Sequence, residues 1–368
     1  MFGNPSLTPD FLHQENAFWF SVSNTIFFQK FITVFSALFG AGIVLMMGED
    51  KQTSKIAIHR RRMFWLLIIG MLHAYFLWYG DILVPYAITG FIIAAARKWN
   101  ARTLVLIGTV LIILNYAIFY LQHWSFGFMS PEELAEINTE MWAPSIEALN
   151  LEISKYRESF FNRSLATAGD SLMFQVIQTF LFGLRTAGVM MVGMTLFKTG
   201  FFTLRWKRSV YALLAVFGIG IGGVGSYWGT AYFISVNFDF ATIFPGQAAL
   251  YWASLAQAFG YSALIMLCCS LSAMALIRKP FAAVGRMALS NYLASTVIGV
   301  LVFYGPPGLG KIGTMEMAEL PIVVAGVWLF ILIWSPLWLA IFRFGPAEWV
   351  WRSLSYGQAQ PILKTANP

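Results

Sequence analysis

Charged residues are scarce in this sequence: Asp, Glu, Lys and Arg make up 11% of its 368 residues, whereas 58% are hydrophobic. A soluble domain carries about 25% charged residues, so the deficit excludes an ordinary water-soluble domain. Apolar stretches long enough to cross about 30 Å of hydrocarbon as helices recur along the chain. Because a helix satisfies its own backbone hydrogen bonds in lipid, we predict an all-α, polytopic transmembrane helical bundle in the lipid bilayer.

Cysteine is almost absent. The two cysteines, Cys268 and Cys269, are adjacent in one apolar stretch, which argues against a disulfide framework, and no second pair exists for zinc. We therefore predict that both side chains pack in the bundle and that the chain holds no metal. The features of a signal peptide are also missing, because residues 1–28 have neither its basic start nor its apolar stretch.

About nine membrane spans are predicted, in two parts separated by a polar insertion. Residues 1–121 form an N-terminal membrane bundle, residues 122–171 an external helical insertion, and residues 172–368 a C-terminal membrane bundle with a cytoplasmic tail. In the insertion, Ser130-Pro131-Glu132-Glu133 is typical of a helix start, and Pro144 predicts a division into two short helices. The sixth span is rich in glycine, which favours close helix packing. The spans are about 29–47, 63–79, 82–96, 103–121, 172–197, 210–232, 248–277, 287–304 and 320–342.

The basic residues are distributed unevenly over the loops. The loops after the odd-numbered spans hold 18 of the 24 Lys and Arg residues, whereas the insertion carries eight acidic residues and only three basic ones. Cytoplasmic loops carry the excess of positive charge, so we predict a cytoplasmic C-terminus and an external insertion. The net charge of +7 therefore does not require a nucleic-acid partner. Nine spans would place the N-terminus outside, and we expect a further span upstream of Met1.

Three polar residues lie in or beside apolar spans, where such residues are costly and usually functional. His73, near the midplane, is either a general base or a histidine bonded to a backbone carbonyl. Arg185, in the fifth span, contacts either an anionic ligand or a buried carboxylate or carbonyl group. Asp81 caps the next helix, orients His73 or pairs with Arg185. Because eight helical residues span about 12 Å, contact between Asp81 and His73 requires a break in the helix.

Two further polar residues are candidate substrate contacts with good structural explanations. Tyr86 follows Asp81 closely, and packing accounts for it. Asn115, inside the fourth span, also suits a hydrogen bond between helices.

Two other patterns indicate local structure. Gly305–Lys311 matches the phosphate-loop pattern, but Ile312 stands where a hydroxyl would hold magnesium, and a membrane span precedes the loop. We therefore reject nucleotide binding there. Residues 345–357 predict a short interfacial helix, in which Glu348 and Arg352 are spaced to form an ion pair.

Five segments from near the start to near the end of the chain carry a family resemblance. They are FSALFGAG (35–42), GDILVPYA (80–87), RTAGVMMVGMTLFKTG (185–200), GRMALSNYL (285–293) and GPAEWVWRSL (345–354). In this order and spacing they resemble the YeiB-like bacterial inner-membrane proteins, which contain domain of unknown function 418. The resemblance implies a bacterial inner-membrane location and adds Arg286 and Asn291 to the candidate substrate-binding residues. The polar residues within or beside these segments are His73, Asp81, Arg185, Arg286, Asn291, Glu348 and Arg352.

The YeiB-like family is distantly similar to membrane acyltransferases, including those that O-acetylate surface polysaccharides and the lysosomal heparan N-acetyltransferases. This resemblance implies a bundle of ten or so spans. It also implies transfer of an acyl group from a cytoplasmic donor, such as acetyl-CoA, to an external polysaccharide or lipid-linked acceptor. The chain departs from those families because it lacks a first span with an Arg-Gly motif.

Two functions of different classes follow. In a transmembrane acyltransferase, His73 is the base, Asp81 orients it and Arg185 stabilises charge. In a transporter or permease for a small anionic or lipid-linked solute, Arg185 contacts the solute. The sequence has no clear internal symmetry, which favours the enzyme. A third function is that of an accessory protein whose acidic insertion docks a partner. The acyl donor, the acceptor and the oligomeric state stay open.

Overall fold

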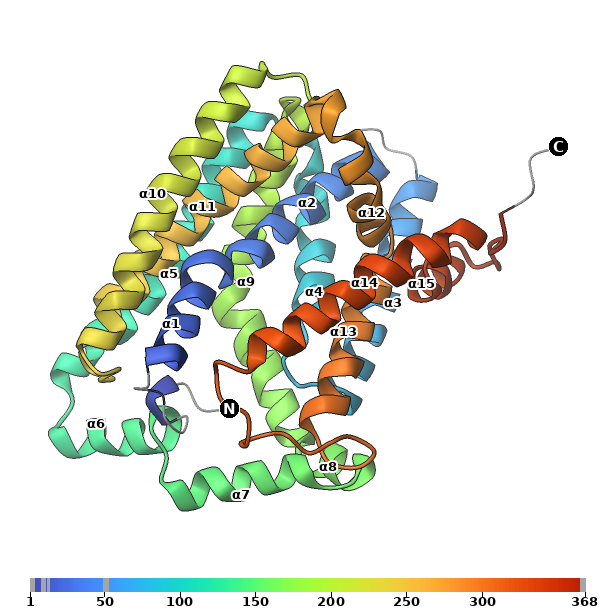
Figure 1. The fold of residues 1–368 in the computed structure, drawn as a ribbon. Helices are drawn as coiled ribbons and strands as arrows, with labels where there is room; N and C mark the ends of the chain where they lie inside the picture. Colours follow the sequence, from blue (N-terminus) through green and yellow to red (C-terminus); the bar gives the residue numbers. More distant parts are fainter. Residues whose placement is uncertain (1–3, 8–10, 12–13, 49–52, 365–368) are drawn as a thin grey trace.

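The computed structural model describes residues 4–7, 11, 14–48 and 53–364, so Lys51 of the first basic loop lies outside the described residues. Within these ranges the chain is helical, and extended pairing is limited to one bridge between Phe342 and Leu363. The predicted all-α bundle is thereby confirmed (Figure 1). The α-helices are α1 (Gln14–Val22), α2 (Lys30–Met47), α3 (Thr53–Phe76), α4 (Leu83–Ile93), α5 (Ala101–Ser125), α6 (Pro131–Ile137), α7 (Ile146–Arg157), α8 (Phe160–Ala166), α9 (Ala168–Lys198), α10 (Arg208–Ser235), α11 (Phe244–Ser270), α12 (Ala275–Arg286), α13 (Ala288–Phe303), α14 (Leu320–Ile341) and α15 (Pro346–Tyr356).

Fewer than nine helices satisfy the length and composition of a membrane span. Among the described residues there are six: the Gln14–Met47 segment that contains α1 and α2, and then α5, α9, α10, α11 and α14. Helices α12 and α13, bent by 78°, make a seventh if they are one broken span. The predicted second and third spans correspond to α3, whose first half carries Lys55 and three consecutive arginines, and to α4, which has only 11 residues. The protein is therefore a polytopic helical membrane protein.

Helix α9 packs against α2, α4 and α5. The contact with α2 depends on a missing side chain, because a Cβ at Gly193 would lie 1.9 Å from the carbonyl oxygen of Ala37. A Cβ at Gly188 would likewise lie 2.5 Å from the carbonyl oxygen of Gly108 on α5. Small residues allow helix backbones to approach closely in lipid, where van der Waals packing drives association. These two crossings hold the part of α9 that follows Arg185.

Helices α10 and α11 form an antiparallel pair along one side of the bundle (Figure 1). The glycines of α10 account for the close contact: Cβ atoms at Gly218, Gly222 and Gly229 would each lie within 2.8 Å of α11 atoms. The close packing predicted for the glycine-rich sixth span is confirmed.

The insertion forms a row of short helices beneath one end of the bundle (Figure 1). Ser130 and Glu133 form a reciprocal capping box at the start of α6, as the sequence predicts. Pro144 does separate two parts, but the second part contains two helices, α7 and α8, instead of one. The insertion is tied to the bundle by Trp142, whose Nε1 donates to the carbonyl of Phe238 at 2.8 Å.

The predicted ion pair between Glu348 and Arg352 does not form in the described structure. Glu348 instead reaches across from α15 to the start of α13, where Oε1 accepts the N–H groups of Leu289 at 2.6 Å and Ser290 at 3.0 Å. The guanidinium of Arg352 lies over the ring of Phe344, 4.9 Å from its centre. Anions stabilise the N-terminus of a helix because its first N–H groups have no helical partner. The carboxylate therefore stabilises the bend between α12 and α13.

We expect Glu348→Ala to lower the free energy of unfolding by about 1–3 kcal/mol, since it leaves two half-buried N–H groups without their charged acceptor. Arg352→Ala, one turn further along the same helix, should cost less than about 1 kcal/mol, because its guanidinium is exposed. Thermal unfolding of the two variants in detergent would measure the difference. Equal losses would instead indicate that the two side chains act as a pair.

Candidate functional site

His73 and Asp81 form a buried contact at the end of α3. His73 is 2% exposed and Asp81 is fully buried, and Nδ1 of the histidine lies 2.9 Å from Oδ1 of the aspartate. The two atoms face each other without the alignment of a good hydrogen bond. Helix α3 ends at Phe76, and the chain then turns back into α4. This is the break that contact between the two residues requires.

Asp81 also caps the helix that follows it. Its Oδ2 accepts the N–H of Val84 at 2.8 Å, so both the capping role and the contact with the histidine occur in one side chain. Tyr292 of α13 donates its hydroxyl to Oδ1 at 3.2 Å. The carboxylate therefore has a partner at each oxygen, and these partners fix its position beside the imidazole.

The other nitrogen of His73 contacts Thr296, one turn after Tyr292 on α13. Nε2 lies 3.0 Å from the threonine Oγ1, which also lies 3.2 Å from the carbonyl oxygen of Tyr292. In a neutral imidazole with its proton on Nδ1, toward Asp81, Nε2 is an acceptor and Thr296 donates to it. In an imidazolium both nitrogens donate, and Thr296 then donates to the carbonyl. In the neutral form Nε2 carries the lone pair that a general base needs.

Arg185 forms the centre of a second buried cluster. It is 7% exposed, and its Nη2 donates to Thr33 Oγ1 at 3.1 Å and to Ser254 Oγ at 2.8 Å. The guanidinium lies 5.0 Å from the ring centre of Tyr251, and its Nε has no hydrogen-bond partner. Its partners, from α2 and α11, are neutral. Thus the carboxylate partner that was one of the two predicted roles is not present among the described residues.

A second buried cation, Lys30, lies on α2 one turn before Thr33, the residue whose hydroxyl accepts from Arg185. Lys30 is fully buried at the start of α2 and donates to the carbonyl of Asn24. Sequence reasoning missed this residue, since its position at the edge of a predicted span is usual for an exposed loop lysine. The π-helical turn Ser23–Phe27 supplies its partner, because Asn24 belongs to that turn.

The remaining predicted contacts lie apart from the His73–Asp81 pair. Tyr86 donates to the carbonyl of Ile32 at 3.1 Å and also bonds Ser36, so it joins α4 to α2. Asn115 bonds the carbonyl of Leu181 and accepts from Tyr251 at 3.2 Å, which connects it to the Arg185 cluster.

Arg286 and Asn291 lie at the bend between α12 and α13. Arg286 is exposed and donates to the carbonyl of Arg343 at 3.1 Å. Asn291 is buried and bonds Ser335 of α14 at 3.0 Å, and it accepts from Trp334 at 2.7 Å. The structure therefore brings six of the seven predicted residues together in three groups: His73 with Asp81, Arg185 with Asn115, and Asn291 beside Arg286. Tyr86 is outside these groups and joins α4 to α2.

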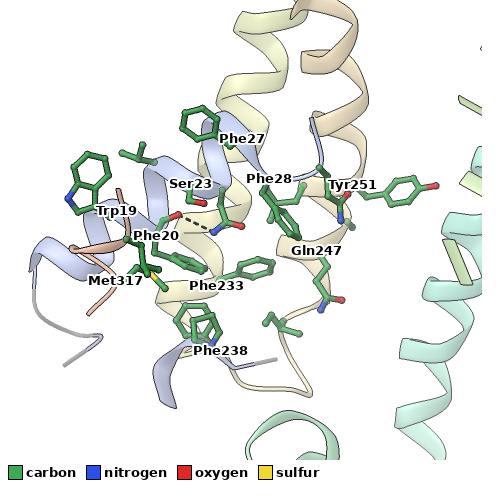
Figure 2. Close-up of a pocket in the computed structure, with 18 of the residues that line it drawn as sticks. Trp19, Phe20, Ser23, Phe27, Phe28, Phe233, Phe238, Gln247, Tyr251 and Met317 are labelled. Carbon is green, nitrogen blue, oxygen red and sulfur yellow. Dashed lines mark hydrogen bonds between the residues drawn. The ribbon is translucent and has the colours of Figure 1, made fainter. Parts of the chain in front are cut away.

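A cavity of about 980 Å³ adjoins the Arg185 cluster. Figure 2 shows the rings of Trp19, Phe20, Phe28, Phe233 and Phe238 around it, with Tyr251 and Gln247 on one side. The described lining contains no acidic or basic side chain. The sequence signal for this cavity is weak, because its aromatic residues come from distant segments, each of which looks like an ordinary membrane span.

No group of three or more His, Cys, Asp or Glu residues that would hold a metal occurs in the part of the chain that the structure describes. The two cysteines are free and partly buried.

The fold and its buried polar clusters define a multi-pass helical membrane protein. Residues 196–358 match the family model described as "Protein of unknown function (DUF418)", and this match supports the resemblance to the YeiB-like family. It covers α10 to α15, including Tyr292 and Thr296, whereas His73, Asp81 and Arg185 lie before it.

Curated relatives extend the likeness over nearly the whole chain. The chain is 28% identical over 381 residues to "Uncharacterized protein YxaH" of Bacillus subtilis, covering 99% of this chain and 90% of that protein. It is 29% identical over 361 residues to "Uncharacterized protein YeiB" of Escherichia coli, covering 92% of this chain and 84% of that protein. Together with the family model, these relatives confirm the resemblance to the YeiB-like proteins. No solved structure matches the chain.

Proposed function

We propose that the protein is a transmembrane acyltransferase in which His73 is the general base. The observation that supports this proposal is the 2.9 Å contact between His73 Nδ1 and Asp81 Oδ1, buried within a membrane bundle. A carboxylate in that position favours the tautomer with its proton on Nδ1 and stabilises the imidazolium that forms when Nε2 takes a proton. Buried ionisable residues in membrane helices are costly and usually functional.

In the proposed reaction an acceptor hydroxyl takes the place of the Thr296 hydroxyl beside His73 Nε2. The histidine removes the proton of the acceptor while the acceptor oxygen bonds to the acyl carbon of the thioester. The carbon–sulfur bond breaks, and the proton passes from Nε2 to the leaving thiolate, so the imidazole is neutral again. Tyr292 and Val84 hold the Asp81 carboxylate throughout.

The proposal includes a location and two substrates. The C-terminus and the basic loops face the cytoplasm of a bacterium and the α6–α8 side faces the envelope, since positive loops stay inside. A cytoplasmic donor such as acetyl-CoA would bring phosphate groups toward Arg60 and Arg61, which are exposed at the start of α3. An envelope polysaccharide or a lipid-linked molecule would be the acceptor.

The test uses the purified full chain in proteoliposomes with acetyl-CoA that is labelled in its acetyl group. We expect saturable binding of the donor by calorimetry and transfer of the label to an envelope polysaccharide fraction. Free labelled acetate is the matched control, because it carries the same acyl group without the thioester. A folded protein that neither binds acetyl-CoA nor transfers the label would contradict acyl transfer.

Transport of a small anionic or lipid-linked solute is the second candidate function. The observation that favours it is the pair of buried cations, Arg185 and Lys30, whose described partners are all neutral. The interruption of the helical segment between Ser23 and Gln29 beside these cations also resembles the broken helices of transporters. Uptake of a labelled anion into vesicles without any acyl donor would support transport, and absence of uptake would count against it.

A further inference from the structure

The cavity of about 980 Å³ is at the upper end of the range for ligand sites. Its wall comes from α1 and the π-helical turn after it, from α5, from both helices of the α10–α11 pair and from the start of α14. The rings are not fully covered, since Phe28 is 50% exposed and Trp19 is 36% exposed. An apolar molecule in the surrounding membrane therefore has both space and access.

Two buried cations lie behind one part of the cavity wall, although neither belongs to the lining itself. Gln29 and Tyr251 both line the cavity; Lys30 follows Gln29 directly, and Arg185 lies over the ring of Tyr251. The backbone at Gln29 is left-handed, with φ of 62°, and its Oε1 has no hydrogen-bond partner. The positive charge therefore lies behind this part of the wall, whereas most of the lining itself is aromatic or aliphatic.

The described partners of both cations are neutral, so their positive charge is not balanced by an anionic side chain. Arg185 donates only to the hydroxyls of Thr33 and Ser254, and Lys30 donates to a carbonyl. Both hydroxyls also have a backbone carbonyl within 2.8 Å to which they donate, so each is fixed as an acceptor for a cation. Like charges in a low-dielectric site repel each other, and an anionic group on the cavity side of the wall would offset that repulsion.

We propose that this cavity binds an amphipathic anion, that is, a long apolar chain with one anionic head. The head lies against Gln29 and Tyr251, behind which Lys30 and Arg185 are buried, and the chain lies among the aromatic rings. This inference deepens the second candidate function by naming the class of molecule that the cations hold, and it rests on that candidate only for the role of Arg185. It does not depend on acyl transfer.

The experiment measures binding alone, with neither an acyl donor nor a gradient. The full chain in phosphatidylcholine nanodiscs is irradiated with palmitate that carries a diazirine, and the cross-linked residues are mapped by mass spectrometry. The matched probe is the corresponding diazirine alcohol, which has the same chain and no charge. We expect the acid to label residues of the cavity wall at least about tenfold more than the alcohol does.

Two variants separate the charge from the cavity. Arg185→Gln should abolish the preference for the acid over the alcohol, and Ala248→Trp, which fills the cavity, should reduce labelling by both probes. The control for the added indole is Val216→Trp, on a side chain of α10 that is 70% exposed and not part of the lining. Labelling by the acid should be unchanged in that variant.

The wild-type comparison decides the proposal even if a variant fails to fold. Equal labelling by the acid and the alcohol, or labelling spread over the outer surface of the bundle, would overturn it. A diazirine phosphatidylglycerol that labels the cavity wall and displaces palmitate would support the same ligand class with a phospholipid as its source. A variant that loses acyl transfer but keeps acid labelling, or loses acid labelling but keeps acyl transfer, would show that this site and the His73–Asp81 pair function independently.

Discussion

His73→Gln should lower the rate of acyl transfer by about 10²–10⁴-fold while the protein stays folded and inserted. Glutamine fills a similar space, but its amide cannot take up a proton as the imidazole does. The histidine is 2% exposed, so its replacement by a smaller residue would add a cavity term that glutamine avoids. Transfer from labelled acetyl-CoA in proteoliposomes, set against the melting temperature, would measure the two effects separately.

His59→Gln is the matched control, because His59 is also buried in α3 and its hydrogen bond within the described structure is to the carbonyl of Gly90, at 3.2 Å. It should retain full transfer. Asp81→Asn should lose most of the activity but keep its stability, since asparagine caps a helix about as well as aspartate and still accepts from Val84. Full activity in His73→Gln would exclude the proposed base.

Gly193→Ala should destabilise the bundle by about 1–3 kcal/mol or more, because the new methyl group would lie 1.9 Å from the carbonyl oxygen of Ala37. The two backbones must then separate, and α9 loses its contact with α2. Since Thr33 on α2 bonds Arg185 on α9, we also expect acid labelling of the cavity to weaken.

Gly183→Ala, ten residues earlier on the same helix, is the matched control. A Cβ there would meet nothing within 4 Å, and alanine is favoured over glycine in helices by roughly 0.5–1 kcal/mol. This variant should therefore be neutral or slightly stabilised. Melting curves of the two variants in the same detergent provide the measurement. A Gly193→Ala protein as stable as the wild type would show that the crossing is not as tight as the distances imply.

The site was predictable in its residues but not in its connections. His73, Asp81 and Arg185 stand out in the sequence because polar groups are costly in apolar spans. The contact between His73 and Asp81 depends on the end of α3 at Phe76, three residues before the predicted end of the second span. Thr296 and Tyr292 complete that group from more than 200 positions away, and their residue types alone give no indication of it.

The sequence by itself determined the solvent of this protein, its helical class and most of its helix boundaries. The length of an apolar stretch and the charge of a loop are local properties, so each can be compared with the requirements of a bilayer without knowing the rest of the fold. The number of spans that pass that test, the bends at Ser23–Gln29 and Met287, and the partner of Glu348 were decided only in the tertiary structure. So were the burial of Lys30 beside Arg185 and the aromatic cavity. These features depend on which helices meet, and contacts between residues distant in the chain leave no period or motif in the sequence.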